Sequence, residues 1–419
     1  MRNARFRILL LICLLLLSSF LNAADFGLIL NQYGGYGNSG DDDNFYEYGA
    51  SLVPRFSFLI GETGSFFTSA SMTFEYNEKG DIYFFPELLR TELAFHSGSF
   101  GIKIGRINYS APIPFIADGI FDGFQFTHAS SAGHFGFGAW YTGGQYKKNA
   151  NIIMTAEDQK LYDSALDYGD FFNTYFAPGR FLASLSWEHP SVGNFLQLNT
   201  AVLGQLDMTK GDGKYHNQYF ILKAGIPIKG FLFEAGGSVE AAQVKKVNFT
   251  TDTQNNKVID DEFKLAFTGE VGLYLTLPVN FSNTLSFTGR YTTGAVNDLI
   301  GAFIPVTTKY YGEIFKAKMT GLTVMGLDYS ARFIKSFGFN FSALYFISND
   351  SVTANYFTAD ENTDNKLLGG EIYAGFTWSP FSDLQLKVGG GAFLPSMGNV
   401  MKDGKTLWKI NITAILALL

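Results

Sequence analysis

The end of the chain reads Trp408-Lys409-Ile410-Asn411-Ile412-Thr413-Ala414-Ile415-Leu416-Ala417-Leu418. Its even-numbered positions are all apolar, whereas Lys409, Asn411 and Thr413 hold odd-numbered positions. Successive side chains of a β-strand point to opposite faces, so a period of two separates these groups in space. The stretch therefore predicts a strand with one face suited to lipid and the other suited to water.

The same period of two recurs throughout the chain, in residues 263–277, 285–292, 327–333, 337–345 and 371–378. In each stretch the aromatic and branched residues share one face, and charged residues, where present, fall on the other. Amphipathic helices repeat near 3.6 residues and do not produce this pattern. We therefore expect an all-β chain of antiparallel strands.

The composition indicates where the apolar face lies. The chain is 47% hydrophobic and 16% charged, with 43 Phe and 22 Tyr, whereas soluble domains carry roughly 25% charged residues. This excludes a disordered chain. No stretch after Asp25 approaches the ~20 apolar residues of a membrane helix, so strands have to carry the apolar surface. A soluble sandwich or propeller is the alternative, but its outer face has to be polar.

Short and long connections alternate along the chain. Tight links are expected near 62–64, 97–99, 130–133, 190–193, 229–230, 278–283, 335–336 and 381–383. Longer connections are expected near 35–44, 108–118, 143–178, 207–216, 245–262, 295–316, 349–367 and 396–404. Short turns at one end and long loops at the other are typical of an outer-membrane barrel. This count predicts a transmembrane antiparallel up-and-down β-barrel of about 16–18 strands.

The N-terminal residues predict a secretory signal peptide at 1–24. Arg2, Arg5 and Arg7 precede an apolar core of ten residues, and the small residues Ala23 and Ala24 follow. A core of this length is too short to span a bilayer. We expect cleavage after Ala23 or Ala24, which leaves residues 25–419 as a single barrel domain. Loss of the three arginines lowers the formal net charge from −7 to −10, which disfavours nucleic acid partners.

The predicted mature chain resembles the porin-like outer-membrane β-barrels of bacteria. The resemblance rests on the signal, the aromatic alternating strands, the terminal strand, and hairpin-like stretches at Gly105-Arg106, 118–123 and 138–143. It implies an outer-membrane location, contact with membrane lipids and with the barrel-assembly machinery during insertion, and assembly as a homotrimer. One departure is the ending Ala417-Leu418-Leu419, since such barrels usually end in an aromatic residue.

Charged residues on the predicted inward face are candidates to line a pore, because rings of such side chains select ions. They are Arg90, Glu92, Lys103, Arg180, Lys223, Glu270, Arg290, Asp328, Arg332, Glu371, Lys387 and Lys409. Arg90, Arg290 and Arg332 are expected to form the basic side of a transverse field. The alternative is that these charges only solvate the interior and pair across strands.

The longest connection, residues 143–178, is predicted to hold one short helix. Thr155 followed by Asp158 is a capping pattern. If this loop folds into the barrel, it places Glu157, Asp158, Lys160, Asp163, Asp167 and Asp170 near the pore as a constriction. A helix that lies over the outer rim is the alternative.

Catalysis and metal binding are not expected. The acidic runs at 41–43, 260–262 and 360–361 lack the spacing of a calcium loop, and no His or Cys cluster has zinc spacing. A barrel hydrolase would pair His and Ser on neighbouring strands, and His128 with Ser130 or His134 is the nearest candidate.

The sequence thus predicts a channel for the passive diffusion of small hydrophilic solutes, without a cofactor. Two alternatives are a transporter of hydrophobic substrates, similar to the fatty acid transporters, and a structural or adhesive surface barrel. An apolar lumen favours the first of these and a filled lumen the second.

Overall fold

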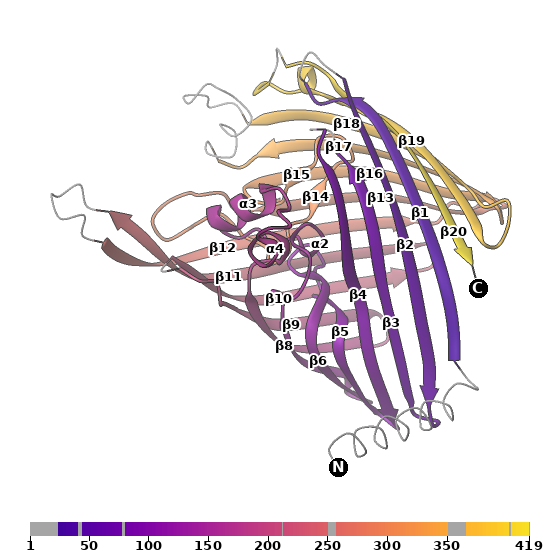
Figure 1. The fold of residues 1–419 in the computed structure, drawn as a ribbon, viewed down its shortest axis with the longest axis horizontal. Helices are drawn as coiled ribbons and strands as arrows, with labels where there is room; N and C mark the ends of the chain where they lie inside the picture. The colour runs from indigo at the N-terminus through magenta and orange to yellow at the C-terminus, as the bar shows by residue number, and fades with distance from the viewer. Residues whose placement is uncertain are drawn as a thin grey trace.

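The structure is a computed structural model that describes residues 24–40, 44–77, 80–211, 213–249, 257–350, 366–401 and 404–418. Eighteen strands within this part of the chain form one antiparallel sheet, in which each strand pairs with its sequence neighbours. The last strand pairs with the first, so the sheet closes into a barrel (Figure 1). The predicted signal peptide lies outside the described residues.

The wall begins with β1 (Ala24–Asn38), β2 (Asn44–Ile60), β3 (Gly64–Tyr76), β4 (Ile82–Ser97), β5 (Phe100–Ser110), β6 (Asp118–Ser130), β7 (Gly133–Tyr141), β8 (Arg180–Val192) and β9 (Leu196–Asp207). It continues with β10 (Lys214–Ile228), β11 (Phe231–Phe249), β12 (Lys257–Leu275), β13 (Ser282–Thr292), β16 (Leu322–Ile334), β17 (Phe337–Ser348), β18 (Leu367–Trp378), β19 (Leu384–Leu394) and β20 (Leu407–Leu418). A separate hairpin, β14 (Tyr310–Tyr311) and β15 (Ala317–Lys318), lies in the connection after β13.

The predicted alternation of faces is confirmed. On β20, Ile410 and Ile412 are 50% and 56% exposed on the outer surface, whereas Lys409, which precedes them, forms an ion pair with Glu47 of β2. The large exposed side chains of the other strands are likewise mostly Phe, Leu, Ile and Val. An outer wall of this kind is stable only against hydrocarbon.

The eight predicted tight links all join neighbouring strands at one end of the barrel. Gly98 and Gly230 occupy two of these turns with φ of 56° and 89°. A side chain with a Cβ rarely adopts such φ values, so glycine fits these turns. Both described ends of the chain, Ala24 and Leu418, lie at this same end of the barrel, because β1 runs away from it and β20 runs back.

The longer connections lie at the other end. The prediction misses the one at residues 77–81, and it wrongly takes 245–262 for a loop. Most of that range belongs to β11 and β12, where Lys245 pairs in register with Asp261 and Lys246 with Asp260. Opposite charges on facing strand positions stabilise a hairpin, so this polar stretch continues the sheet.

Three short helices lie in the connection after β7: α2 (Lys147–Ala150), α3 (Ala156–Asp163) and α4 (Phe171–Tyr175). The predicted helix is α3, and Thr155 caps it as expected. A 3-10 turn, η2 (Pro395–Met397), follows β19. Within the described residues, no helix is long and apolar enough to cross a bilayer.

Three connections, residues 111–117, 142–179 and 293–321, form an apolar core with inward side chains of the wall. Ile113, Ile152 and Phe303 contribute one buried side chain from each connection. The connections also bind each other, because Val306 N donates to the Ile116 carbonyl at 2.7 Å and Thr308 N donates to the Asn151 carbonyl at 2.7 Å. These segments therefore fill part of the lumen.

Candidate pore and its constriction

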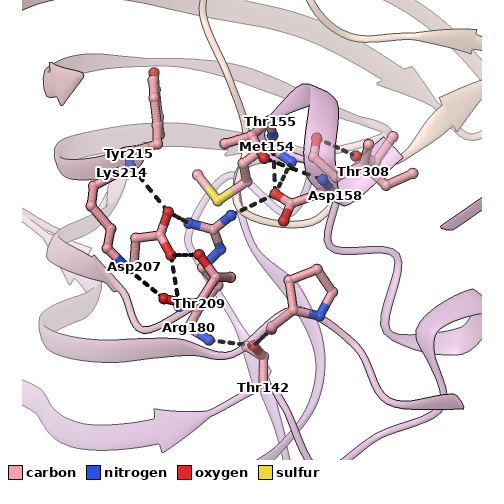
Figure 2. A network of polar contacts seen from close by, with 12 residues as sticks. Thr142, Met154, Thr155, Asp158, Arg180, Asp207, Thr209, Lys214, Tyr215 and Thr308 are labelled. Carbon is pink, nitrogen blue, oxygen red and sulfur yellow. Dashed lines mark hydrogen bonds and ion pairs between the residues drawn. The ribbon is translucent and has the colours of Figure 1, made fainter. Parts of the chain in front are cut away.

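Arg180 of β8 fixes the 142–179 connection to the wall (Figure 2). Its guanidinium has no exposed surface and contacts two carboxylates: Asp158 of α3 at 2.5 Å, and Asp207 at the end of β9. Asp158 Oδ2 also accepts hydrogen bonds from Met154 N and Thr155 N, both at 3.0 Å. This ion-pair network holds helix α3 against β8 and β9.

The network shows how the constriction loop is oriented. Asp158 was expected near the pore and Arg180 on its wall, and each is buried against the other. A buried charge is stable only when it is paired and hydrogen-bonded. Both residues therefore determine where the loop lies, and neither presents a free charge to a solute.

Inward carboxylates hold the 293–321 connection in a similar way. Glu371 of β18 accepts hydrogen bonds from the backbone nitrogens of Glu313, Ile314 and Phe315, at 2.7, 3.3 and 2.8 Å. Glu240 of β11 accepts one from Ile304 N at 2.9 Å. Glu371, another candidate pore residue, is buried in this position. The wall thus supplies acceptors for backbone groups of the inserted loop.

A charge cluster spans four neighbouring strands, β10 to β13. Lys223 lies 3.0 Å from Glu234 and 3.2 Å from Glu270, and Arg290 lies 3.7 Å from the other oxygen of Glu270. The Arg290 guanidinium also lies over the ring of Tyr311, 4.9 Å from its centre. The two acids thus lie between the two bases, and three of the four residues were candidate pore residues.

A second cluster joins β4 and β5. Glu92 pairs with Arg90 at 2.6 Å and with Lys103 at 3.5 Å. A bulge in β4 makes this possible, because Leu89 has no partner in the register between β3 and β4. Leu88 therefore remains on the outer surface although Arg90, two residues on, faces inward. A bulge inserts one residue and reverses the parity of the faces.

A third pair crosses β1. Lys409 of β20 binds Glu47 of β2, although β1 lies between these strands. Gly35 and Gly37 occupy the positions of β1 in register with Glu47 and Lys409. A Cβ at Gly35 would lie 2.6 Å from a carboxylate oxygen of Glu47. The missing side chain is what allows the ion pair to lie across the strand.

Asp328, Arg332 and Lys387 are the remaining candidates on strands. No ion pair involves them within the described part of the chain. Arg332 lines a hollow of about 300 Å³ near the tight-turn end, together with Ser282, Asn340 and Lys335. Its side chain is exposed there.

The other candidate constriction residues lie on the surface of the loop. Glu157 and Lys160 are exposed on α3, and Asp163 accepts a hydrogen bond from Gln159 Nε2 at 2.6 Å. Asp167 accepts one from Gly169 N in the turn before α4, and Asp170 accepts one from Asn173 Nδ2 of α4. Sequence reasoning missed Lys147, which is buried in α2 and donates to the carbonyl of Ser164 at 2.9 Å and to its hydroxyl at 2.6 Å. Burial lowers the pKa of the Lys147 ammonium to about 8.

The His and Ser candidates do not meet. His128 stacks on the ring of Phe100, with centres 4.5 Å apart, and the Ser130 hydroxyl donates to the Gly133 carbonyl at 3.1 Å. Of the acidic runs, 41–43 and 360–361 lie outside the described residues, as do the side-chain surroundings of Asp260.

Comparison with solved structures identifies the fold. OccK2 (OpdF) of Pseudomonas aeruginosa superposes over 95% of this chain and 98% of its own, with a TM-score of 0.59 and 12% identity. The outer membrane protein OpdK of the same species superposes over 95% and 99%, with a TM-score of 0.57 and 11% identity. The chain has a porin-like outer-membrane barrel fold. The predicted resemblance is thus confirmed, and the barrel formed by the described residues has eighteen strands.

Two further structures of OccK2 and OpdK, which also resemble this chain, contain small carboxylates. OccK2 is known in complex with glucuronate, at 12% identity and a TM-score of 0.58, and OpdK with vanillate, at 10% identity and 0.59. No protein-family model matches the sequence of this porin-like barrel, and no curated protein matches it either.

Proposed function

We propose that the chain forms an outer-membrane channel for the passive diffusion of small hydrophilic solutes. The observation that carries the proposal is the set of charged clusters on the inner wall beside the inserted loops: Lys223, Glu234, Glu270 and Arg290 on one side, and Arg90, Glu92 and Lys103 on another. Charged side chains on a barrel's inner face indicate water in contact with them. Such diffusion involves no cofactor and no catalytic step.

The loop anchors support a narrowed path. Arg180 and Glu371 hold loops in place, so we assign solute contact to the other candidates: Arg90, Glu92, Lys103, Lys223, Glu270, Arg290, Asp328, Arg332, Lys387 and Lys409. Glu157, Lys160, Asp163, Asp167 and Asp170 are proposed to border the path from the loop side. Arg90, Arg290 and Arg332 form its basic side, and among the described residues Arg332 has no acidic partner to offset its charge.

Small carboxylates are the first solutes to test, because glucuronate and vanillate bind the similar barrels OccK2 and OpdK. Membrane lipids, the assembly machinery and a homotrimer are the partners proposed with this function.

The test is single-channel conductance of the refolded protein in a planar bilayer, with reversal potentials under a salt gradient. We expect stable steps, and a shift of the permeability ratio toward cations in Arg290→Gln and Arg332→Gln. Lys229→Gln is the matched control, because Lys229 lies in the tight turn after β10. The absence of conductance steps, or an unchanged permeability ratio in both arginine variants, contradicts the proposal.

A further inference from the structure

The side wall of the barrel is interrupted between β4 and β5. The two strands pair only from Thr91–Arg106 to Ser97–Phe100. Beyond this point β4 continues to Ile82, paired with β3 alone, and β5 continues to Ser110, paired with β6 alone. The edge of β4 between Ile82 and Arg90 therefore has no strand beside it on the β5 side.

This interruption lies within the apolar band of the wall. Phe84 and Leu88 of β4 are 50% and 45% exposed on the outer surface, and the apolar residues Phe74 and Ala70 of β3 lie in register with them. An unpaired strand edge at membrane depth leaves backbone groups without partners, which is costly in hydrocarbon. Something other than a strand has to satisfy the edge.

Three long side chains do so. Tyr168 Oη accepts from Phe84 N at 3.1 Å and donates to the Phe84 carbonyl at 2.5 Å. Tyr175 Oη donates to the Pro86 carbonyl at 2.7 Å, and Arg106 Nη1 donates to the Leu88 carbonyl at 2.5 Å. Residues 84, 86 and 88 alternate, as the bonded positions along one strand edge do. Side chains thus take the place of a neighbouring strand.

Two of the three come from the inserted loop, around helix α4. Figure 1 shows α2 and α4 beside the upper half of β4, where β5 has left it. Phe85 of β4 packs there in a buried cluster with Tyr146, Leu166 and Tyr175. The Phe85 and Tyr146 rings are 4.2 Å apart. Residues 166–176, the plug segment, therefore close the gap through side-chain contacts alone.

The plug segment also carries exposed aromatic residues. Tyr168 is 61% exposed and Phe172 is 79% exposed. A loop held by side chains opens at a lower free energy than a strand held by a ladder of backbone hydrogen bonds. Displacement of the plug segment would join the lumen to the membrane through the wall.

We propose that this gap is a lateral route between the lumen and the outer leaflet, closed by the plug segment. The route suits amphipathic molecules, because its rim combines the rings of Phe85 and Tyr146 with the Arg106–Asp122 ion pair at 2.7 Å. An apolar body contacts the rings and a polar head contacts the charged pair. The inference rests on the proposed channel, since a lateral route requires a water-filled lumen at its inner end.

The test uses cysteine labelling, because Cys13, in the predicted signal peptide, is the only cysteine of the chain. Phe85→Cys places a thiol behind the plug segment, and the probe is a maleimide with a dodecyl chain that partitions into the bilayer. Phe84→Cys, exposed to lipid, is the positive control, and Phe121→Cys, buried in the core formed by the inserted loops, is the negative control. We expect Phe85→Cys to react faster than Phe121→Cys.

Removal of the two hydroxyl groups should release the plug segment. In the background Tyr168→Phe with Tyr175→Phe, the rings remain and three hydrogen bonds are lost, so labelling of Phe85→Cys should rise about tenfold or more. Tyr48→Phe, on the lipid-facing side of β2, is the matched control. Labelling of Phe85→Cys that matches Phe121→Cys in both backgrounds overturns the proposal, and so does an equal rise at both thiols.

Two further measurements keep the result unambiguous. Hydrogen exchange at the Phe84 amide should accelerate in Tyr168→Phe without any cysteine present, and unchanged exchange there counts against the assigned contact even if Phe85→Cys does not fold. Conductance of the same variants separates the two proposals. If the protein conducts but the Phe85→Cys thiol remains unlabelled, the channel proposal stands and the lateral route is rejected.

Discussion

Arg180 is the residue on which the position of helix α3 depends, because it pairs with two buried carboxylates, one on α3 and one on the wall. Arg180→Met leaves Asp158 and Asp207 facing each other, and loss of one member of a buried ion pair costs about 3–5 kcal/mol. We expect the 142–179 loop to become sensitive to limited proteolysis. The triple variant that adds Asp158→Asn and Asp207→Asn should recover most of the resistance. A single variant as resistant as the parent protein would contradict this role.

Lys147 gives the same loop a pH dependence. Its pKa is lowered from the usual 10.5 to about 8, mainly by burial and further by the neighbouring Lys148, whereas Asp163 opposes the shift. Between pH 8 and 10.5 the released loop holds a proton that the docked loop has lost, so docking becomes more stable as pH rises through this window. Below pH 8 Lys147 is protonated in both the docked and the released loop, so the free-energy cost of burying its charge no longer changes with pH.

Proteolysis of the loop at pH 7.5 and pH 10 checks this expectation. Cleavage should slow at the higher pH in the parent protein, and Lys147→Met should abolish most of the difference. Lys160→Met, an exposed substitution on α3, serves as the control for other groups that titrate in the range. An equal pH effect in Lys147→Met and Lys160→Met would refute the assignment.

At the scale of elements, strand β1 is important because it has a glycine where a side chain would obstruct an ion pair. Gly35 leaves room for Glu47 to reach Lys409 across the strand, and an added Cβ would lie 2.6 Å from that carboxylate. We expect Gly35→Ala to displace the ion pair and to destabilise the β20–β1–β2 seam by about 1–3 kcal/mol. Thermal unfolding in detergent measures the change.

The adjacent residue provides the control. Gly34 has only the Glu47 carbonyl oxygen near the position of a Cβ, at 3.9 Å, which is ordinary contact. Gly34→Ala should therefore leave the unfolding temperature close to that of the parent protein. Equal losses in the two variants would show that chain flexibility, and not the space for Glu47, requires glycine in β1.

At the scale of the whole molecule, the three inserted connections act as one unit. They share an apolar core and bind each other through Val306, Thr308 and their carbonyl partners. Replacement of residues 296–319 by a short Gly-Ser linker should raise the conductance several-fold and should also expose the 142–179 loop to protease. Shortening of the connection between β11 and β12 should do neither. An unchanged conductance in the first variant would argue against a constriction made by these loops.

The wall could be predicted from the sequence because it depends on a local pattern. Alternation in stretches such as 408–418 requires only a period of two, and the tight turns have their own short signals. The strand number remained open between 16 and 18, because loop and strand are hard to separate in a polar stretch such as 245–262. The bulge at Leu89 shows a further limit, since one unpaired residue reverses the faces and carries no mark in the sequence.

The interior could not be predicted in the same way. Asp158 was a candidate constriction residue and Arg180 a candidate pore residue. Their pairing could not be predicted, because it requires the loop to fold back onto the wall and to bring together two residues that lie 22 positions apart in the sequence. Asp207, Glu234 and Glu240 gain their roles from strand registers that bring distant residues together. The direction of the 142–179 loop likewise follows from contacts with β8 and β9, which the loop's own sequence does not specify.

Closure of the ring depends on the final strand of the chain. Because β1 pairs with β20, the second edge of β1 is covered only once Leu407–Leu418 has joined the sheet. A chain cut before residue 407 would hold two open edges, on β1 and β19, that hydrocarbon cannot satisfy. A stable barrel in the membrane therefore requires β20.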